Sequence, residues 1–457
     1  MRLWGGRFSG EPEKELMKFS ASLNFDVRLY PYEVRVLKAW TKVCEEAGVI
    51  SSEEQNVIIH ALDQIKEELD SGRFEFKDTD EDIHTAVERR LKEIAGNEAG
   101  KIRIGRSRND LVATDERLLV IEEMKRLNSL TCLLEKALLF KAKEVLGVVV
   151  PGHTHLKQAQ PVLLSHLILC FAWMFERDRQ KFSFASNSAD LMSLGSGAFA
   201  GTTLPLDRKE IAHELGFSRI SENSVDAVAD RDFVIDAVYS CAIAMNHASR
   251  LAEQLILWCS DEFGLVEISD EWSTGSSMMP QKKNPDGLEL VRGKAGRVSG
   301  ALLSLLVMMK GLPLSYNRDM QEDKEPLFDA IDTTKSSLTV LEGIVRTLKF
   351  DLERAKELVG KGYIYATDLA DYLAGKGVDF AHAHEIVGKI ISYCNSENKT
   401  LSRISIDELK RFSNLFENDA LALLDLSASI SRRSACGGTA ISEVERQMEK
   451  LGQILEN

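Results

Sequence analysis

The feature that most constrains this chain is a long stretch, from Asp110 to Gly147, that contains no proline and no internal glycine. Leucine, isoleucine and valine recur through it at helical spacing, with charged residues between them. The pattern predicts one helix of roughly 36 residues, about 54 Å long at 1.5 Å per residue. Other elements of the fold must therefore pack against this helix along its whole length.

Four further segments have the same character, and they run from Val162 to about Ala189, Asp232 to Phe263, Asp286 to Lys310 and Glu325 to Leu358. Their apolar residues surround most of the helix instead of forming one stripe, which indicates burial on several sides. One chain does not readily surround five such helices, whereas association with copies of itself does. We therefore expect a mainly α fold that assembles into an oligomeric bundle.

Shorter helices and longer loops flank the five long segments. They predict three domains: a mostly helical N-terminal domain over residues 1–108, a central bundle of long helices over 109–358, and a small helical C-terminal domain over 359–457. Short helices are expected at Ala366–Ala374 and Ala381–Ser392, and the run from Gly147 to Val150 is the one β-like stretch.

Charge and cysteine content narrow the class of protein. The 457 residues carry a formal net charge of -14, which argues against nucleic acid or an anionic membrane as a partner. Seven scattered cysteines without a Cys-x-x-Cys pair are typical of reduced, buried thiols in a cytosolic protein. The N-terminus lacks the apolar region of a signal peptide, and the apolar stretch from Val162 to Phe175 is too short to span a bilayer. We expect a soluble, cytoplasmic protein.

The segment from Ser273 to Asp286 has the composition of an anion-binding loop. It places hydroxyl groups and the ammonium groups of Lys282 and Lys283 ahead of an Asn284-Pro285 pair. That pair has the form of a helix N-cap followed by its first residue, and a helix start favours negative charge. A surface turn capped by Asn284 is the alternative interpretation.

A second candidate anion site precedes the longest helix. Ile104 to Asp110 brings two arginines and Asn109 to the predicted helix start. Asn109 fits an N-cap, with Asp110 complementing the helix dipole. The same segment, with Arg108, also fits a carboxylate-binding site.

Two histidines, His153 and His155, lie in a loop bounded by Pro151 and Pro161. A third metal ligand at suitable spacing is missing, so a zinc site is rejected. Since imidazole titrates near neutral pH, proton transfer is the better interpretation.

Three other polar segments are weaker signals. Asp78 to His84 lacks the glycine and the final glutamate of a calcium-binding loop, and is otherwise a solvated helix start. Tyr316 to Lys324 alone fits a solvated loop, Gly195 to Gly201 fits a loop without dinucleotide spacing, and His382 and His384 fit a surface helix.

Several of these segments resemble those of one family. Gly275 to Pro285 is similar to the signature Gly-Ser-Ser-x-Met-Pro-x-Lys-x-Asn-Pro of the fumarase/aspartase superfamily, and Gln281 to Asp286 has the version found in its argininosuccinate lyase branch. The segments around Arg108 and His155 also resemble that family, as does Trp4 to Phe8. The resemblance covers essentially the whole chain.

The resemblance implies roles for individual residues. Ser276 would be the base and His155, oriented by Glu289, the acid, although these two labels could be exchanged. Lys282 and Asn284 would stabilise developing negative charge. The implied substrate-binding residues are Ser22, Arg108, Asn109, Thr154, Asn284, Tyr316, Gln321 and Lys324, and the supporting residues are Asp82, His84 and Ser277. No metal and no organic cofactor is implied.

The same resemblance implies an activity and an assembly. The activity is the reversible β-elimination of argininosuccinate to fumarate and L-arginine, the last step of arginine biosynthesis, through a carbanion intermediate. The assembly is a homotetramer with a twenty-helix core, whose active sites combine segments from three subunits. Two alternatives stay open: elimination of the adenylosuccinate lyase type, and a catalytically silent structural protein like the crystallins derived from this family.

Overall fold

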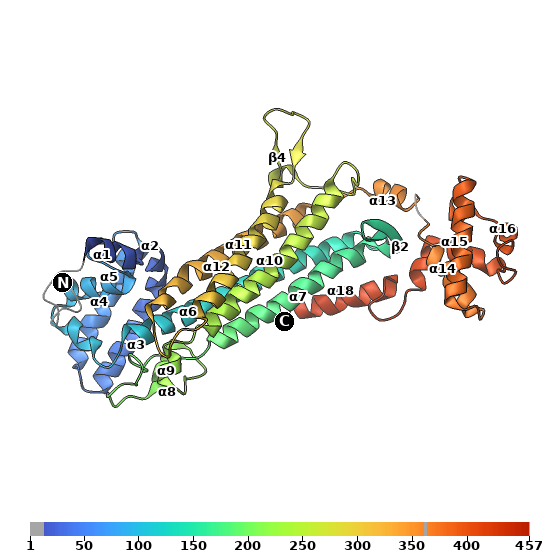
Figure 1. Ribbon diagram of the computed structural model, residues 1–457. Coiled ribbons are helices and arrows are strands. Elements are labelled where there is room, and N and C mark those ends of the chain that lie inside the picture. Colours follow the sequence, from blue (N-terminus) through green and yellow to red (C-terminus); the bar gives the residue numbers. More distant parts are fainter. Residues whose placement is uncertain (1–12, 361–362, 457) are drawn as a thin grey trace. The chain divides into compact units, whose positions relative to one another are not determined.

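The computed structural model describes residues 13–360 and 363–456, and it is mainly helical (Figure 1). The segment from Trp4 to Phe8 lies outside the described residues, as do Lys361 and Gly362. Five long helices are present, at the places where the sequence predicts them. They are α6 (Arg108–Glu144), α7 (Leu164–Ala189), α10 (Asp232–Cys259), α11 (Asp286–Met309) and α12 (Lys324–Thr347).

The last of these helices is shorter than predicted. It ends at Thr347, and the chain then forms strand β6 (Lys349–Phe350), which pairs with β3 (Val266–Glu267). A new helix, α13 (Leu352–Val359), starts where the Asp351 side chain accepts a hydrogen bond from the Arg354 amide. The predicted helix to Leu358 was therefore wrong because Asp351 is an N-cap that starts a separate helix.

The chain divides into two compact units. Unit 1 comprises residues 1–129, 178–244 and 294–335, and unit 2 comprises residues 130–177, 245–293 and 336–457. This division crosses all five long helices. The three-domain organisation with boundaries near 108 and 359 stays a prediction.

Short helices make up the rest of unit 1. They are α1 (Lys14–Ser20), α2 (Leu23–Asp26), η1 (Val27–Leu29), α3 (Tyr30–Glu46), α4 (Ser52–Asp70), α5 (Ile83–Ala95), η2 (Glu98–Arg103), α8 (Arg208–Leu215), α9 (Ser224–Ala227) and η4 (Arg318–Asp323). Helix α4 begins with a capping box between Ser51 and Glu54, and α3 packs against α4 and α5. Trp40 and Leu62 are fully buried there, so α5 packs on a well-filled core.

Within the described ranges, the strands number six, and all of them lie in unit 2 in two-stranded sheets. The longest pair is an antiparallel hairpin of β1 (Val149–Thr154) and β2 (Lys157–Leu163). A two-residue pair joins β4 (Thr274–Gly275) to β5 (Lys283–Asn284) after η3 (Asp270–Trp272). The predicted β-like run is confirmed at Val149, but β2 was missed because its polar residues and Pro161 hide the pattern.

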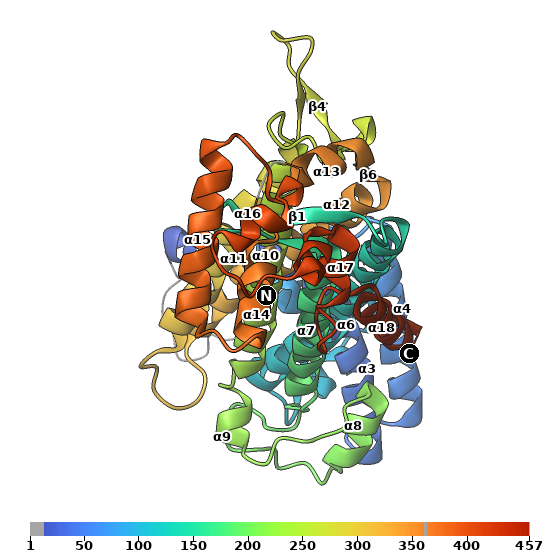
Figure 2. The same cartoon turned by 90° about the vertical axis from the view of Figure 1, so that its right-hand side faces the viewer.

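Small helices complete unit 2 after α13 (Figure 2). They are α14 (Ala366–Gly375), α15 (Phe380–Ser396), η5 (Leu401–Arg403), α16 (Ile406–Lys410), η6 (Asn418–Leu424), α17 (Leu426–Ser431) and α18 (Ile441–Glu456). Helices α14 and α15 share a core that includes the fully buried Leu369, Ile390 and Phe416. The two predicted short helices are confirmed, and His382 and His384 are exposed on α15.

The cysteines are all free thiols, but the prediction that they are buried is only partly right. Cys44, Cys241 and Cys394 are buried, whereas Cys170 and Cys436 are exposed. In the parts of the chain that the structure describes, no helix is long and apolar enough to cross a bilayer.

Candidate active site

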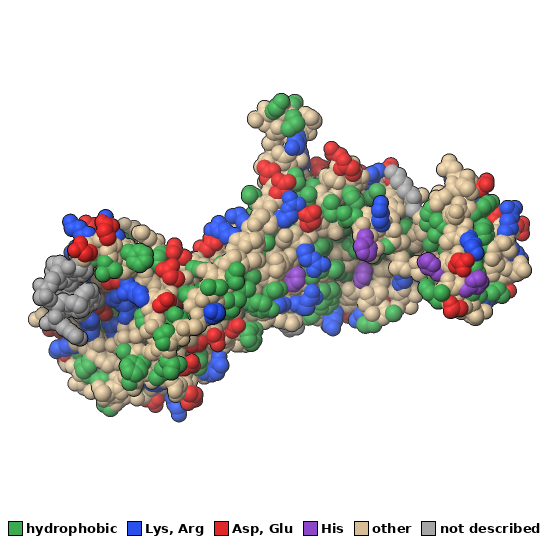
Figure 3. All heavy atoms as spheres, in the orientation of Figure 1, with side chains coloured by type: hydrophobic (Ala, Val, Ile, Leu, Met, Phe, Trp, Pro, Cys, Tyr) green, Lys and Arg blue, Asp and Glu red, His purple; other side chains and the backbone are tan. Residues whose placement is uncertain are grey.

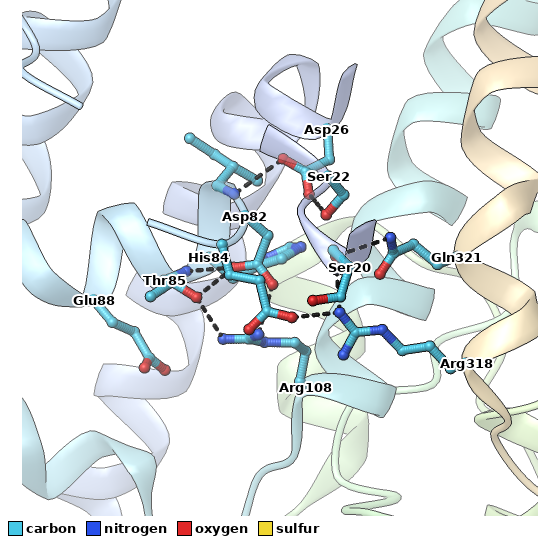
Figure 4. A network of polar contacts seen from close by, with 12 residues as sticks. Ser20, Ser22, Asp26, Asp82, His84, Thr85, Glu88, Arg108, Arg318 and Gln321 are labelled. Atoms are coloured by element: carbon cyan, nitrogen blue, oxygen red, sulfur yellow. Dashed lines mark hydrogen bonds and ion pairs between the residues drawn. The ribbon is translucent and has the colours of Figure 1, made fainter. Parts of the chain in front are cut away.

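The N-terminus of α5 holds the first predicted site residues in unit 1. Asp82 is the N-cap of α5, because its Oδ1 accepts a hydrogen bond from the Thr85 amide at 2.7 Å. Its other oxygen, Oδ2, pairs with Arg108 Nη1 at 2.5 Å, and Arg108 Nη2 donates to Thr85 Oγ1 at 3.1 Å (Figure 4). Burial acts to raise the pKa of Asp82, but the charges of Arg108 and His84 outweigh it and lower that pKa. The carboxylate thus holds the guanidinium in one orientation.

A second set of bonds ties α2 to the same place. Ser22 Oγ donates to Asp26 Oδ2 at 2.5 Å, and Asp26 Oδ1 accepts the Ile83 amide at 3.0 Å. The Ser22 amide donates to the Glu81 carbonyl at 2.9 Å. Ser22 and Asp26 are almost completely buried, and burial raises the pKa of Asp26. Ser22 is therefore fixed beside Asp82, and the predicted solvated acidic segment is instead a buried, hydrogen-bonded helix start.

Helix η4 adds two more side chains to this group. Arg318 Nη2 and Gln321 Nε2 both donate to the Ser20 carbonyl, at 3.0 Å and 3.2 Å, and Arg318 also pairs with Glu81. Figure 4 shows Arg318 and Arg108 approaching the Asp82 region from neighbouring elements. We call Ser22, Asp82, Arg108, Arg318 and Gln321 the Arg108 cluster.

The start of α6 differs from the prediction in its capping. Helix α6 begins at Arg108, and Ser107 is its N-cap: the Ser107 hydroxyl accepts from the Asn109 amide, and the Ser107 amide donates to Asp110 Oδ1 at 2.9 Å. Asn109 is thus inside the first turn, so its interpretation as the cap was wrong. Its Nδ2 donates to the Ala198 carbonyl at 3.1 Å.

Asp110 clamps a glycine-containing loop onto this helix start. Its Oδ2 accepts from the amides of Gly195 and Gly197, at 3.0 Å and 2.8 Å. Both glycines have positive φ, which an L side chain rarely adopts. The carboxylate is fully buried, and burial raises the pKa of Asp110 to about 6. The loop predicted at Gly195–Gly201 is therefore fixed against the start of α6, next to Asn109.

Lys324 lies in a buried network of four charges at the start of α12. Its Nζ contacts Glu116 at 2.5 Å and Asp323 at 2.8 Å, and Arg231 contacts the same two carboxylates at 3.3 Å and 2.5 Å. Burial acts to lower the pKa of Lys324, but the charges of Asp323 and Glu116 raise it overall. The half-buried Tyr316 has a raised pKa because of burial, against the opposing charge of Lys324. The segment predicted as a solvated loop is therefore partly buried, at Met320, Asp323 and Lys324.

The remaining predicted residues belong to unit 2. Thr154 and His155 lie at the tip of the β1–β2 hairpin and are exposed. His155 and Leu156 have φ values of 55° and 58°, in the left-handed region that two-residue hairpin turns require. Glycine and asparagine normally supply such turns, so the strained pair is a sign of function at this tip.

The 273–286 loop holds Ser276 in a tight turn between β4 and β5. Ser276 Oγ accepts hydrogen bonds from the amides of Met278 and Met279, at 3.3 Å and 3.1 Å. Asn284 lies in β5, and the Pro285 carbonyl accepts the Leu288 and Glu289 amides that open α11. Asn284 is therefore not the N-cap, as predicted, because pairing with Thr274 keeps it extended.

The two loop lysines behave differently. Lys283 pairs with Asp270 at 2.7 Å and with Glu267 at 3.3 Å, whereas Lys282 and Ser277 are exposed and make no ion pair or side-chain hydrogen bond with the residues described. Glu289 is exposed in the first turn of α11, and no described contact joins it to His155. Lys282 thus has its ammonium available for a ligand.

The structure brings one group of predicted residues together and leaves the other separate. In unit 1, Ser22, Asp82, Arg108 and Gln321 belong to the Arg108 cluster. In unit 2, hydrogen bonds between His155 and Ser276 are absent from the described residues. Sequence reasoning missed Asp26, Glu81 and Arg318. Glu81 and Arg318 pair with each other across 237 positions, so no local pattern marks them. Asp26 follows Ser22 by four positions, a helical spacing that could have been detected.

Metal-type ligands converge at one other place in unit 1. Among the described residues, one group of His, Cys, Asp or Glu side chains is close enough to hold a metal ion. It consists of Glu33, His84 and Asp115, all buried, and includes neither His153 nor His155.

Comparison with known proteins agrees with this geometry. The family model described as "Lyase" matches residues 6–300, and the model described as "Argininosuccinate lyase C-terminal" matches residues 363–431. A class II fumarase from Schistosoma mansoni has the same fold, with 17% identity, a TM-score of 0.74, and coverage of 87% of this chain and 90% of that one. The fold and the matched model thus define a lyase of the fumarase/aspartase type.

Closer relatives specify the branch. An argininosuccinate lyase from Symbiobacterium thermophilum is 47% identical over 99% of this chain and 98% of its own length. The structure of an EDDS lyase variant with bound fumarate has 26% identity and a TM-score of 0.84, covering 98% of this chain and 91% of that one. The chain belongs to the argininosuccinate lyase family.

Proposed function

We propose that the protein eliminates L-arginine from argininosuccinate to form fumarate, reversibly and without a metal or organic cofactor. The observation that carries the proposal is the Arg108 cluster, which presents guanidinium groups on a fixed frame next to a helix start. Argininosuccinate has a dicarboxylate half that two such groups and helix N-H groups would bind. The full-length similarity to an argininosuccinate lyase supports this substrate.

In the proposed mechanism, Ser276 removes the proton next to the substrate carboxylate. Two backbone amides already donate to its Oγ, and such donors favour the charged form of an oxygen. Lys282 and Asn284, in the same loop, would stabilise the carbanion and its dianionic carboxylate as charge develops. The exposed loop must close over the substrate to do this.

His155 is the proposed acid that protonates the departing guanidinium nitrogen. The hairpin tip presents its ring to solvent beside Thr154, which we assign to substrate binding. Glu289 would orient the ring in the assembled enzyme, as a carboxylate orients histidine in many acid-base pairs. An exchange of the acid and base roles between His155 and Ser276 is the alternative.

The other substrate contacts come from unit 1. We assign the dicarboxylate half to Arg108 and Asn109, together with Ser22. Lys324, Tyr316 and Gln321 would complete the site, with the Lys324 ammonium held in place by the carboxylates of Glu116 and Asp323. Asp82 orients Arg108, and the charge of His84 favours the charged form of Asp82. Ser277 is assigned a supporting role beside Ser276.

We further propose a cytoplasmic homotetramer whose active sites combine segments from different copies. Large apolar side chains are exposed on the long helices, among them Phe140, Leu303 and Val307, each at least 61% exposed. Figure 3 shows such hydrophobic side chains gathered along the helices. Exposed apolar surface of this kind favours association, and a twenty-helix core would cover it.

The test is an absorbance measurement in the fumarate band after purified protein is mixed with argininosuccinate. Adenylosuccinate in a parallel reaction is the control for the alternative elimination. We expect fumarate from argininosuccinate alone, unchanged by a chelator. Fumarate from adenylosuccinate alone would support the alternative lyase, and no product from either would support the silent structural protein.

A further inference from the structure

Behind the Arg108 cluster, three buried groups meet at His84. Its Nδ1 lies 2.8 Å from Glu33 Oε2, on α3, and 3.7 Å from Asp115 Oδ2, on α6. All three side chains are at most 3% exposed. Glu33 and Asp115 have no part in the proposed substrate contacts, yet burying a carboxyl group is unfavourable unless it is paired.

The closeness of the two carboxyl groups favours a proton on one of them. One side-chain oxygen of Glu33 and one of Asp115 lie within 4.8 Å of each other and of the His84 ring nitrogen. Two ionised carboxylates this close in a buried site repel each other, which keeps one of them protonated. Glu33 Oε1 and both oxygens of Asp115 have no hydrogen-bond partner among the described residues. A protonated Asp115 that donates to Glu33 Oε1 satisfies both groups.

The charges around the cluster agree with that distribution. Burial, then the charge of Glu33, raises the pKa of Asp115 well above its usual value. Burial acts to raise the pKa of Glu33, but His84 outweighs it and lowers that pKa. Burial acts to lower the pKa of His84, but the charge and hydrogen bond of Glu33 raise it overall. Arg106 also lowers the pKa of both carboxyl groups.

The other side of His84 faces the Arg108 cluster. The charged groups there are Asp82, at the start of α5, Asp26, at the end of α2, and Arg108. A positive imidazole lowers the pKa of both aspartates and so favours their charged forms. Nε2 of His84 has no partner among the described residues, which leaves a donor for a bound water.

We propose that Glu33 and Asp115 are positioning residues: an ionised Glu33, hydrogen-bonded by a neutral Asp115, keeps His84 as an imidazolium that holds Asp82 charged and Arg108 oriented for the substrate. This inference rests on the proposed function for its effect on catalysis. The charge of His84 itself is independent of that function. The alternative is that Glu33, His84 and Asp115 together bind a metal ion.

Two isosteric variants test the proposed charges, because the proposal makes Glu33 negative and Asp115 neutral. Glu33→Gln removes the negative charge next to His84, whereas Asp115→Asn replaces one neutral donor by another. Glu46→Gln, exposed on the same helix as Glu33, is the matched control. The protein would carry ¹³C-labelled histidine, with the His84 signal assigned by its loss in His84→Gln, and the signal would be followed against pH by NMR.

We expect His84 to titrate above the usual histidine range in the unchanged protein. In Glu33→Gln its pKa should fall by at least about one unit, and in Asp115→Asn and Glu46→Gln by less than about half a unit. For argininosuccinate, Glu33→Gln should raise KM about tenfold with kcat within about threefold, since it loosens Arg108 without touching the reacting atoms.

Three results would overturn the inference: an equal fall of the His84 pKa in Asp115→Asn, no fall in a folded Glu33→Gln, or about one tightly bound metal ion per chain by elemental analysis of the unchanged protein. If Glu33→Gln does not fold, Asp115→Asn still decides, because a neutral His84 there contradicts the assignment. If the unchanged protein fails to cleave argininosuccinate while the NMR results hold, the proposed function fails and the charge assignment stands.

Discussion

The Arg108 cluster and the 273–286 loop are both parts of the proposed site, but they are built in opposite ways. Each side chain of the cluster is held by a hydrogen bond or an ion pair within unit 1. The loop is mostly exposed, and Lys282 lacks an ion pair among the described residues. A site that recognises a carboxylate needs fixed geometry, whereas a segment that covers the substrate must move. The difference predicts that substitutions in unit 1 affect stability or KM, while those in the loop affect kcat.

The largest effect should come from the buried charges behind the cluster. Arg231→Met leaves Glu116 and Asp323 with only Lys324 to compensate them. We expect the free energy of unfolding to fall by about 3–5 kcal/mol, as when one partner of a buried pair is removed. Denaturant unfolding measures it. Arg297→Met, which breaks an exposed pair with Asp329, should cost less than about 1 kcal/mol. Equal losses in both variants would contradict the distinction.

Asp110 should give unit 1 a characteristic pH dependence. Its pKa of about 6 in the folded protein is above the unfolded value of 3.8. The folded state therefore holds this proton more tightly, and the resulting stability, about 3 kcal/mol at most, is present below about pH 4 and is lost as pH rises through about 6.

The measurement is the free energy of unfolding of the unchanged protein minus that of Asp110→Asn, from pH 4 to 7. We expect this difference to decrease with rising pH. A flat difference, or one that increases, would show that the backbone amides keep Asp110 ionised throughout.

In the loop, Ser276→Ala should lower kcat by at least about 10²-fold and leave the oligomer and the free energy of unfolding unchanged. The control is Ser273→Ala, since that hydroxyl donates to the Ser269 carbonyl of its own turn. It should retain activity within about threefold. Near-normal turnover in Ser276→Ala would remove serine from the chemistry and favour another base.

The smallest predicted effect is that of Arg108→Lys. Lysine does not reproduce the two-pronged contact with Asp82 and Thr85, so the substrate KM should rise about tenfold, or about 1.4 kcal/mol, with kcat nearly constant. Arg103→Lys, an exposed site just ahead of α6, is the control. A fall in kcat with constant KM would assign Arg108 to the chemical step.

The long helices could be predicted because their signal is local: each lacks proline and repeats apolar residues over many turns. The end of α12 could not, because Asp351 caps a new helix only where β6 pairs with β3. Arg108 and Ser276 could also be predicted from the sequence, because each lies in a short local motif. Arg318 was missed because its partner Glu81 is 237 positions away, and such pairing depends on the folded chain.

The most direct test of the shared site mixes two impaired variants, Arg108→Ala from unit 1 and Ser276→Ala from the loop. If each site takes its Arg108 cluster and its loop from different copies, co-refolded mixtures will contain some sites with both groups intact. We predict that the mixture forms fumarate from argininosuccinate much faster than either variant alone under the same conditions. A mixture no faster than its components, despite forming mixed oligomers, would contradict the shared site.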